Sequence, residues 1–109
     1  MRRRRRAVVV VLVTCPKRAA KRLAEALVQH RLAACVNIVP GVQSVFRWQG
    51  KVDRASEALL VIKLPAAGFQ PLRQAVLQLH PYDVPEIIAL PVRAGHPAYL
   101  AWVLKSVNS

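Results

Sequence analysis

The chain has 109 residues, 54% of them hydrophobic and 20% charged, and its formal net charge is +12. This length leaves room for one domain, and the high hydrophobic fraction excludes a chain that stays disordered throughout. The run from Arg2 to Arg6 supplies five of the positive charges. Because like charges in a block repel one another, we expect a disordered basic tail over residues 1–6 and one folded domain over residues 7–109.

The apolar segment after the arginines, residues 7–13, resembles the core of a secretion signal. We expect no cleavage there, because Thr14 suits a cleavage site poorly and removal would take away the most apolar segment of the chain. The segment is also far shorter than the roughly 20 residues that cross a bilayer. Its β-branched residues instead predict a central strand, Ala7–Thr14, with both faces buried.

The residues after Pro16 predict an amphipathic helix that ends near Leu32. Its apolar stripe consists of Ala20, Leu23, Ala24, Leu27 and Val28. The helix separates Cys15 from Cys35, and about 15 helical residues hold their ends more than ~20 Å apart. A disulfide between these cysteines is therefore not expected, and free thiols favour a cytoplasmic location.

Two strands joined by a tight turn are predicted next. The first covers Cys35–Val39, is interrupted by Pro40-Gly41, which indicates a bend or bulge, and resumes over Val42–Trp48. Gln49-Gly50 supplies the turn, and the second strand runs from Val52 to Leu64. The last half of this second strand is apolar on both faces, which again indicates a central strand.

The rest of the chain predicts a helix, a strand and a helix. The second helix, which ends at His80-Pro81, carries Phe69, Leu72, Val76 and Leu79 on its apolar side. A fourth strand over Glu86–Leu90 is followed by Pro91, which cannot donate a ladder hydrogen bond and so indicates an edge strand. The last helix begins at Pro97, and its apolar stripe consists of Leu100, Val103, Leu104 and Val107.

The resulting order, β-α-β-β-α-β-α, is that of an α+β, ferredoxin-like fold with an antiparallel sheet and an additional C-terminal helix. The first and third strands are expected in the middle of the sheet, and right-handed crossovers place the first two helices on one face. The other face of both central strands is also apolar, and each uncovered side chain there would forgo roughly 1.5–3 kcal/mol of burial. We therefore expect identical chains to associate through this face.

Several specific segments follow one another in order over residues 7–109. They are Leu32–Gly41 (LAACVNIVPG), Ser44 with Trp48–Lys51 (WQGK), Glu57–Lys63, His80–Glu86 (HPYDVPE) and Tyr99–Trp102 (YLAW). Together they resemble the CutA proteins, the divalent-cation tolerance family. The resemblance implies a homotrimer related to the PII signalling proteins, with sheets packed toward a three-fold axis and strands paired between subunits. It implies no enzymatic reaction.

The resemblance also implies a role in tolerance of divalent cations, copper above all, and binding of Cu²⁺. Copper proposals for the family involve a histidine before Pro-Tyr, which is His80 here, and a first-strand cysteine, where this chain has Val13. Cys15 lies two residues further on, so it faces the same side of the strand and is a candidate replacement. The alternative for His80 is a structural role at the helix end. Sequence spacing predicts no metal site within one chain, so several subunits would have to share the ligands.

Six residues are candidates for a cleft between subunits that binds a small ligand or a metal ion: Trp48, Glu57, Lys63, Tyr82, Glu86 and Trp102. Lys63, Tyr82 and Glu86 are expected to cluster where the sheet meets a neighbouring subunit, because buried charges need partners. Glu57 and Lys63 share one face of a strand but lie about 20 Å apart, so they cannot pair with each other. The alternatives are structural ion pairing for the charged residues and core or interface packing for the tryptophans.

Two other classes of function remain open from the sequence. The arginine tail and Phe46-Arg47-Trp48 fit a binder of nucleic acid or another polyanion, which would hold its partner through counterion release. An enzyme that uses Cys35 as a nucleophile is a third hypothesis, although this cysteine lies among apolar residues with no base nearby in the sequence. No cofactor other than a divalent cation and no membrane span are expected.

Overall fold

A computed structural model describes residues 7–107 of the chain. Its elements are β1 (Val8–Pro16), α2 (Lys17–Gln29), β2 (Cys35–Trp48), β3 (Lys51–Pro65), the short 3₁₀ helix η1 (Ala66–Gly68), α3 (Phe69–Leu79), β4 (Ile88–Pro91) and α4 (Pro97–Ser106). Apart from η1, this is the predicted order of helices and strands. The arginine tail lies outside the described residues, so its disorder stays a prediction.

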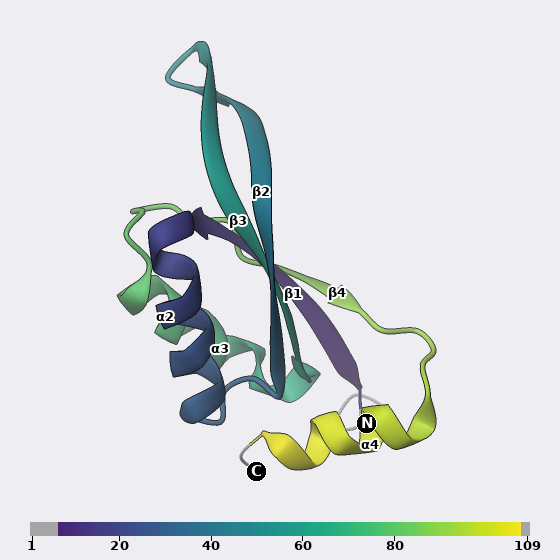
Figure 1. Ribbon diagram of the computed structural model, residues 1–109. Coiled ribbons are helices and arrows are strands. Elements are labelled where there is room, and N and C mark those ends of the chain that lie inside the picture. Colours follow the sequence, from purple (N-terminus) through teal and green to yellow (C-terminus); the bar gives the residue numbers. More distant parts are fainter. Residues whose placement is uncertain (1–6, 108–109) are drawn as a thin grey trace.

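The strands form one four-stranded antiparallel sheet in the order β2-β3-β1-β4. The prediction that the first and third strands are central is confirmed, and β4 is an edge strand as Pro91 indicated. β1 pairs with β3 from Val8 opposite Pro65 to Pro16 opposite Glu57. Helices α2 and α3 lie together on one side of this sheet (Figure 1).

Helix α2 is shorter than predicted. It ends at Gln29, and two residues later Arg31 adopts a positive φ of 58°, which no continuing α-helix allows. The backbone N–H groups of Leu32 and Ala33 then both donate to the carbonyl of Leu27, which closes the helix end. Val28, predicted in the apolar stripe, is consequently 42% exposed on the last turn.

Strand β2 is continuous, and the bend or bulge that the sequence predicted at Pro40-Gly41 is present without breaking the strand. Pairing with β3 shifts register between Val39 and Val42, so Pro40-Gly41 forms a bulge within the strand. Gly41 has a φ of 73°, a value that glycine adopts without steric cost. The fourth strand also differs from prediction, since it begins at Ile88 and the residues from Glu86 belong to the preceding loop.

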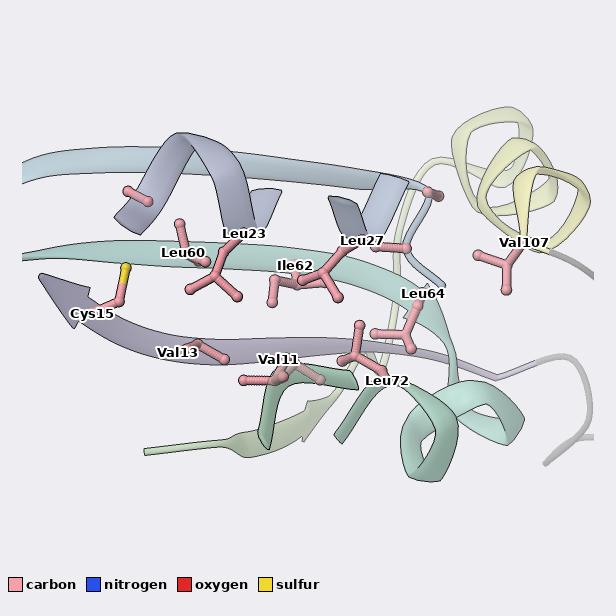
Figure 2. Packing of buried hydrophobic residues seen from close by; sticks show 14 of the residues in the cluster. Val11, Val13, Cys15, Leu23, Leu27, Leu60, Ile62, Leu64, Leu72 and Val107 are labelled. Atoms are coloured by element: carbon pink, nitrogen blue, oxygen red, sulfur yellow. The ribbon is translucent and has the colours of Figure 1, made fainter. Parts of the chain in front are cut away.

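The hydrophobic core lies between the sheet and helices α2 and α3. Alternate residues of the two central strands point into it (Figure 2): Val11, Val13 and Cys15 from β1, and Leu60, Ile62 and Leu64 from β3. Leu23 and Leu27 of α2 and Leu72 of α3 cover them and are fully buried. Burial of each such side chain contributes about 1.5–3 kcal/mol, so this interface holds the layers together.

Alternation places a second set of apolar side chains on the opposite face of the sheet, which we call the open face. Leu12 of β1 stands opposite Val61 of β3 and Ile88 of β4, and all three point away from α2 and α3. Ile88 is 48% exposed and Leu90 is 47% exposed. The predicted second apolar face is therefore present, and in one chain it is only partly covered.

The β2–β3 hairpin and helix α4 occupy opposite ends of the molecule. The β2–β3 ladder continues past the end of β1 as far as Trp48 opposite Lys51, so the hairpin projects from the sheet (Figure 1). At the other end α4 lies beside the ends of β1 and β3, and Val103 in this helix and Val107 directly after it belong to the core. The hairpin gives the molecule its elongated shape, 45 × 25 × 23 Å.

Candidate functional site

The loop between α3 and β4 is fastened to the end of β1 by His80. This side chain is 7% exposed, and its Nε2 lies 2.8 Å from the carbonyl oxygen of Thr14. A carbonyl can only accept, so Nε2 carries the proton and donates it. Nδ1 is then the acceptor for the backbone N–H of Tyr82 at 3.1 Å. Both ring nitrogens are thus committed to the protein, and the carbonyl that His80 bonds belongs to β1 rather than to the end of its own helix, as the alternative for His80 had it.

This arrangement directs Tyr82 toward a buried carboxylate. The phenol of Tyr82 donates to Oε2 of Glu57 at 2.8 Å, and Glu57 is only 5% exposed. Burial, the hydrogen bond to Glu57 and the charge of that carboxylate raise the pKa of Tyr82 to about 12. The nearby Arg18 acts weakly in the opposite direction. Tyr82 therefore serves as a neutral donor that satisfies the buried charge.

A groove of about 790 Å³ opens beside this pair, between the hairpin and the loop. From the hairpin, Ser44, Phe46 and Trp48 of β2 stand opposite Ala55, Asp53 and Lys51 of β3. Directly opposed residues of an antiparallel pair share a face, and this face continues from Glu57 and therefore from the open face. The groove is the extension of the open face along the hairpin.

Acidic side chains are concentrated in this groove. The chain contains five Asp and Glu residues in total, and four of them line it: Asp53, Glu57, Asp83 and Glu86. Glu86 accepts a hydrogen bond from the hydroxyl of Thr14 at 3.4 Å. Arg54 is the basic residue in the lining. The groove therefore has a formal charge of −3 within a strongly basic protein.

Four of the six predicted cleft residues meet here, and two lie elsewhere. Trp48, Glu57, Tyr82 and Glu86 all line the groove. Lys63 lies further along β3, where its amino group contacts the side-chain oxygen of Asn37. Within one chain Lys63 therefore does not join Tyr82 and Glu86.

Trp102 lies on α4 at the other end of the sheet, 46% exposed. Its ring stacks obliquely on Tyr99, with 5.6 Å between ring centroids. Burial, followed by the proximity of Cys35, raises the pKa of Tyr99. Whether a neighbouring subunit brings Lys63 or Trp102 to a groove stays a prediction.

The donor atoms of one chain do not fit a metal ion. His80 has no free nitrogen, and Cys15 is fully buried among apolar side chains. Burial, and secondarily the charge of Glu57, raise the pKa of the Cys15 thiol, whereas a metal ligand must be a thiolate. Within residues 7–107, no three His, Cys, Asp or Glu side chains converge on a common point. Both cysteines are free, as predicted from their separation.

Several residues of the groove were not identified from the sequence. Phe46 and Asp53 became part of the site because the hairpin register places them opposite each other on the face that carries Trp48. A period of two along the strand, counted from Trp48, would have found Phe46 and Ser44. Asp83 and Thr14 depend on the path of the loop after His80, for which the sequence carries no periodic signal.

The comparisons with known proteins agree with this architecture. The model of the CutA1 divalent ion tolerance protein family matches residues 9–106. The chain belongs to this CutA1 family. The matched range includes every residue of the groove, and the family resemblance seen in the sequence is thereby confirmed.

Two curated CutA relatives show how closely the chain follows the family. The divalent-cation tolerance protein CutA of Thermus thermophilus is 52% identical over 99 residues, which are 90% of this chain and 96% of the relative. The chloroplastic CutA of Arabidopsis thaliana is 51% identical over 100 residues, 91% of this chain. The match spans only 55% of the Arabidopsis protein, so that relative has a large additional part.

Solved CutA structures share the fold. The divalent cation tolerance protein of Thermus thermophilus superimposes with a TM-score of 0.91 at 48% identity, covering 93% of this chain and 99% of that one. A protein from Nostoc described as PII-like CutA gives a TM-score of 0.88 at 31% identity, covering 92% and 97%. The chain is therefore an α+β protein of CutA type with an antiparallel sheet. None of the helices described here has the length and hydrophobicity needed to span a bilayer.

Proposed function

We propose that the protein acts in divalent-cation tolerance as a homotrimer of ferredoxin-like subunits. In this proposal, clefts between the subunits bind a divalent metal ion such as Cu²⁺ or a small ligand, and the protein catalyses no reaction. Membership of the CutA1 family supports the role in cation tolerance. The PII-like description of the Nostoc relative supports an assembly in which subunits share ligand sites. The same match gives no support to the alternative of a nucleic-acid binder.

The observation that carries the proposal is the open face and its extension into the groove. Apolar side chains such as Ile88 and Leu90 remain about half exposed in one chain. A second surface that covers them would recover burial energy, and identical copies are the commonest partner of a soluble protein. The groove continues this face, so a neighbour that covers the open face also supplies a wall for the groove.

A shared cleft also accounts for the poor fit of one chain to a metal ion. Carboxylates at the rim of the groove, such as Asp83 and Glu86, are available to combine with ligands from a neighbour. The two sequence candidates, His80 and Cys15, are both engaged or buried inside one subunit. Metal binding would therefore depend on association, with the carboxylate rim as the contribution of each chain.

The proposal is tested first by light scattering, which should give three times the mass of one chain at micromolar concentration. Calorimetric titrations with Cu²⁺ and Zn²⁺ follow, on the wild type and on Glu86→Gln. Both metals are needed, because nitrogen and oxygen sites favour copper over zinc irrespective of function. A stable monomer would contradict the trimer, and equal Cu²⁺ affinity in the wild type and Glu86→Gln would remove this rim from the site.

The proposed location is the cytoplasm, with the two free thiols as its support. The Arabidopsis relative is described as chloroplastic, so location varies within the family. Fractionation of cells that express the full chain, with detection by antibody, tests this assignment. Recovery of the protein outside the cytoplasmic fraction would contradict it.

A further inference from the structure

The groove and the arginine run are the two strongest concentrations of charge in the chain, and they have opposite signs. The groove carries four carboxylates and one arginine. Residues Arg2 to Arg6 carry five positive charges without an intervening residue. We propose that the arginine segment of one copy of the chain occupies the groove of another copy. The inference rests on the association of copies proposed above.

The wall of the groove selects the chemistry of this occupant. Phe46, Trp48 and Tyr82 contribute aromatic rings to the lining and are 39%, 55% and 38% exposed. A planar guanidinium stacks on such rings and also pairs with carboxylates through two parallel N–H donors. A lysine ammonium lacks both the plane and the fork. Alternating aromatic and acidic groups therefore fit a run of arginines better than a run of lysines.

The geometry of β1 indicates that the arginines come from another copy. The segment joins β1 before Val8, whereas Thr14, at the edge of the groove, is near the far end of that strand. Six strand residues span about 20 Å, and the six-residue segment reaches at most about 20 Å when fully extended. Asp53 lies a further six residues along β3 from Leu59, the partner of Thr14, and so about 20 Å beyond this limit. The length of the segment therefore does not allow it to reach beyond the near edge of the groove in its own chain.

Association through the open face would bring the segment of a neighbour toward the groove. The open face on which copies would meet runs directly into the groove, so the N-terminus of one copy can approach the groove of the next. The arginines would neutralise carboxylates that a monomer leaves facing water. Such a contact would also compete with any cation for the same carboxylates, so the segment would act as a built-in competitor of metal binding.

The test uses the full chain with Arg2 to Arg6 replaced by serine, in a Trp102→Phe background in which Trp48 is the remaining tryptophan. A synthetic peptide of sequence MRRRRRA is titrated while the emission of Trp48 is recorded. We expect saturable binding of one peptide per chain and a shift in Trp48 emission. Raising NaCl from about 0.05 M to about 0.5 M should weaken binding strongly, because the contacts are partly exposed charges.

Matched variants separate a built site from general charge attraction. Asp83→Asn with Glu86→Gln should weaken peptide binding about tenfold, since two ionic contacts are lost. Glu25→Gln on α2 removes an exposed carboxylate outside the groove and should leave the affinity unchanged. The peptide MKKKKKA should bind at least about fivefold more weakly than the arginine peptide, because lysine cannot stack.

Three results would overturn the inference: no saturable binding, equal affinity for the lysine peptide, or an equal effect of Glu25→Gln and the groove variants. If the double variant unfolds, Trp48→Leu with calorimetric detection replaces it, because this exposed hairpin residue contributes little to the core. A failure of peptide binding by a protein that light scattering shows to be a trimer would refute this contact alone. A monomer that still binds the peptide would refute the proposed trimer and leave the groove contact standing.

Discussion

At the scale of single residues, the site depends on a series of hydrogen bonds that links His80, Tyr82 and Glu57. His80 fixes the loop by donating to Thr14 and accepting from the backbone of Tyr82, and Tyr82 then donates to Glu57. Each bond sets the position of the next group, so the loop has one arrangement relative to β1. The buried charge of Glu57 is tolerated because the phenol of Tyr82 donates a hydrogen bond to it.

Tyr82→Phe should lower the free energy of unfolding at neutral pH by about 1–3 kcal/mol, because Glu57 would stay buried without its donor. The pKa of Tyr82 is raised from 10.0 to about 12, so the folded state holds this proton more tightly than the unfolded state does. That contribution to stability is complete below pH 10 and is lost as the pH rises from 10 to 12. Urea denaturation at several pH values should therefore show a steeper alkaline loss of stability in the wild type than in Tyr82→Phe.

A direct control for this prediction is the absorbance of phenolate. The chain has two tyrosines, so a Tyr99→Phe variant reports on Tyr82 alone. Its single transition should lie near pH 12 in the folded protein. A transition at the ordinary tyrosine value would show that the bond to Glu57 is absent in solution.

Cys15 should be inert toward thiol reagents in the folded protein. Its side chain has no exposed surface, and burial together with Glu57 raises the pKa of its thiol. After brief treatment of the native protein with iodoacetamide, mass spectrometry of peptides should find Cys15 unmodified. The same treatment in denaturant should modify it fully. Rapid native labelling would contradict the buried position and reopen Cys15 as a metal ligand.

Residue roles were only partly predictable from the sequence. Trp48, Glu57, Tyr82 and Glu86 were predicted for a cleft between subunits, and in one chain all four line the same groove. The part of a neighbouring subunit in that cleft stays a prediction. Lys63 was grouped with them although six strand residues separate it from Glu57. The sequence contains no information on the direction of the loop after His80, which decides whether Tyr82 reaches Glu57 or Lys63.

At the scale of elements, the β2–β3 hairpin combines a bulge, a tight turn and a long two-stranded part that extends past the end of β1. Gln49 and Gly50 connect the strands as a two-residue loop, with φ values of 49° and 79°. Positive φ at both positions is the pattern of a type I′ turn. The favoured sequence for this turn is Asn-Gly, and glutamine tolerates the left-handed conformation less well than asparagine does. Gln49 is therefore the residue of this turn that suits its backbone conformation least well.

Gln49→Asn should raise the free energy of unfolding by roughly 0.5–1 kcal/mol, because asparagine tolerates the left-handed conformation better. Gly50→Ala should lower it by about 1 kcal/mol. No atom lies within 4 Å of a Cβ placed on Gly50, so the loss would come from the backbone conformation alone. Thermal and urea denaturation measure both changes, and equal effects of the two substitutions would argue against this turn type.

Helices and strands were predicted well because their periodic signals are strong. The errors fell at their ends, where single residues decide the conformation. Arg31 terminates α2 early by taking a positive φ, although nothing in its side chain favours that value. Pro40-Gly41 predicted a bend or bulge, and the structure confirms a bulge there, with Gly41 in the left-handed region and β2 continuous across it. Tertiary pairing with β3 decided that outcome.

At the scale of the whole molecule, one layer of helices is too little to cover a sheet that is apolar on both sides. Alternation along β1 and β3 places Leu12 and Val61 opposite the core residues, and β4 adds Ile88 and Leu90 at the edge. Charge is distributed unevenly as well, since most of the carboxylates lie in one groove of a basic chain. The uncovered apolar side chains and the carboxylates lie on the open face and on the groove that continues it. Association of chains and formation of the site therefore depend on the same surface.

Ile88→Glu should convert the associated protein to monomers while leaving each subunit folded. In one chain Ile88 is 48% exposed, so the glutamate can stay hydrated and the cost within the subunit is small. In an assembly that covers the open face, the same carboxylate would lose its hydration without a partner, at a cost of several kcal/mol per site. Light scattering should therefore report the mass of one chain, with an unchanged circular dichroism spectrum.

Leu77→Glu is the matched control, because Leu77 is 40% exposed on α3, the helix layer on the other side of the sheet. Its mass should equal that of the wild type. If both variants stayed associated, the open face would not be the contact surface, and the groove would have to be complete within one chain. If only Ile88→Glu dissociates and also loses Cu²⁺ binding, the metal site requires the neighbour, as the committed nitrogens of His80 lead us to expect.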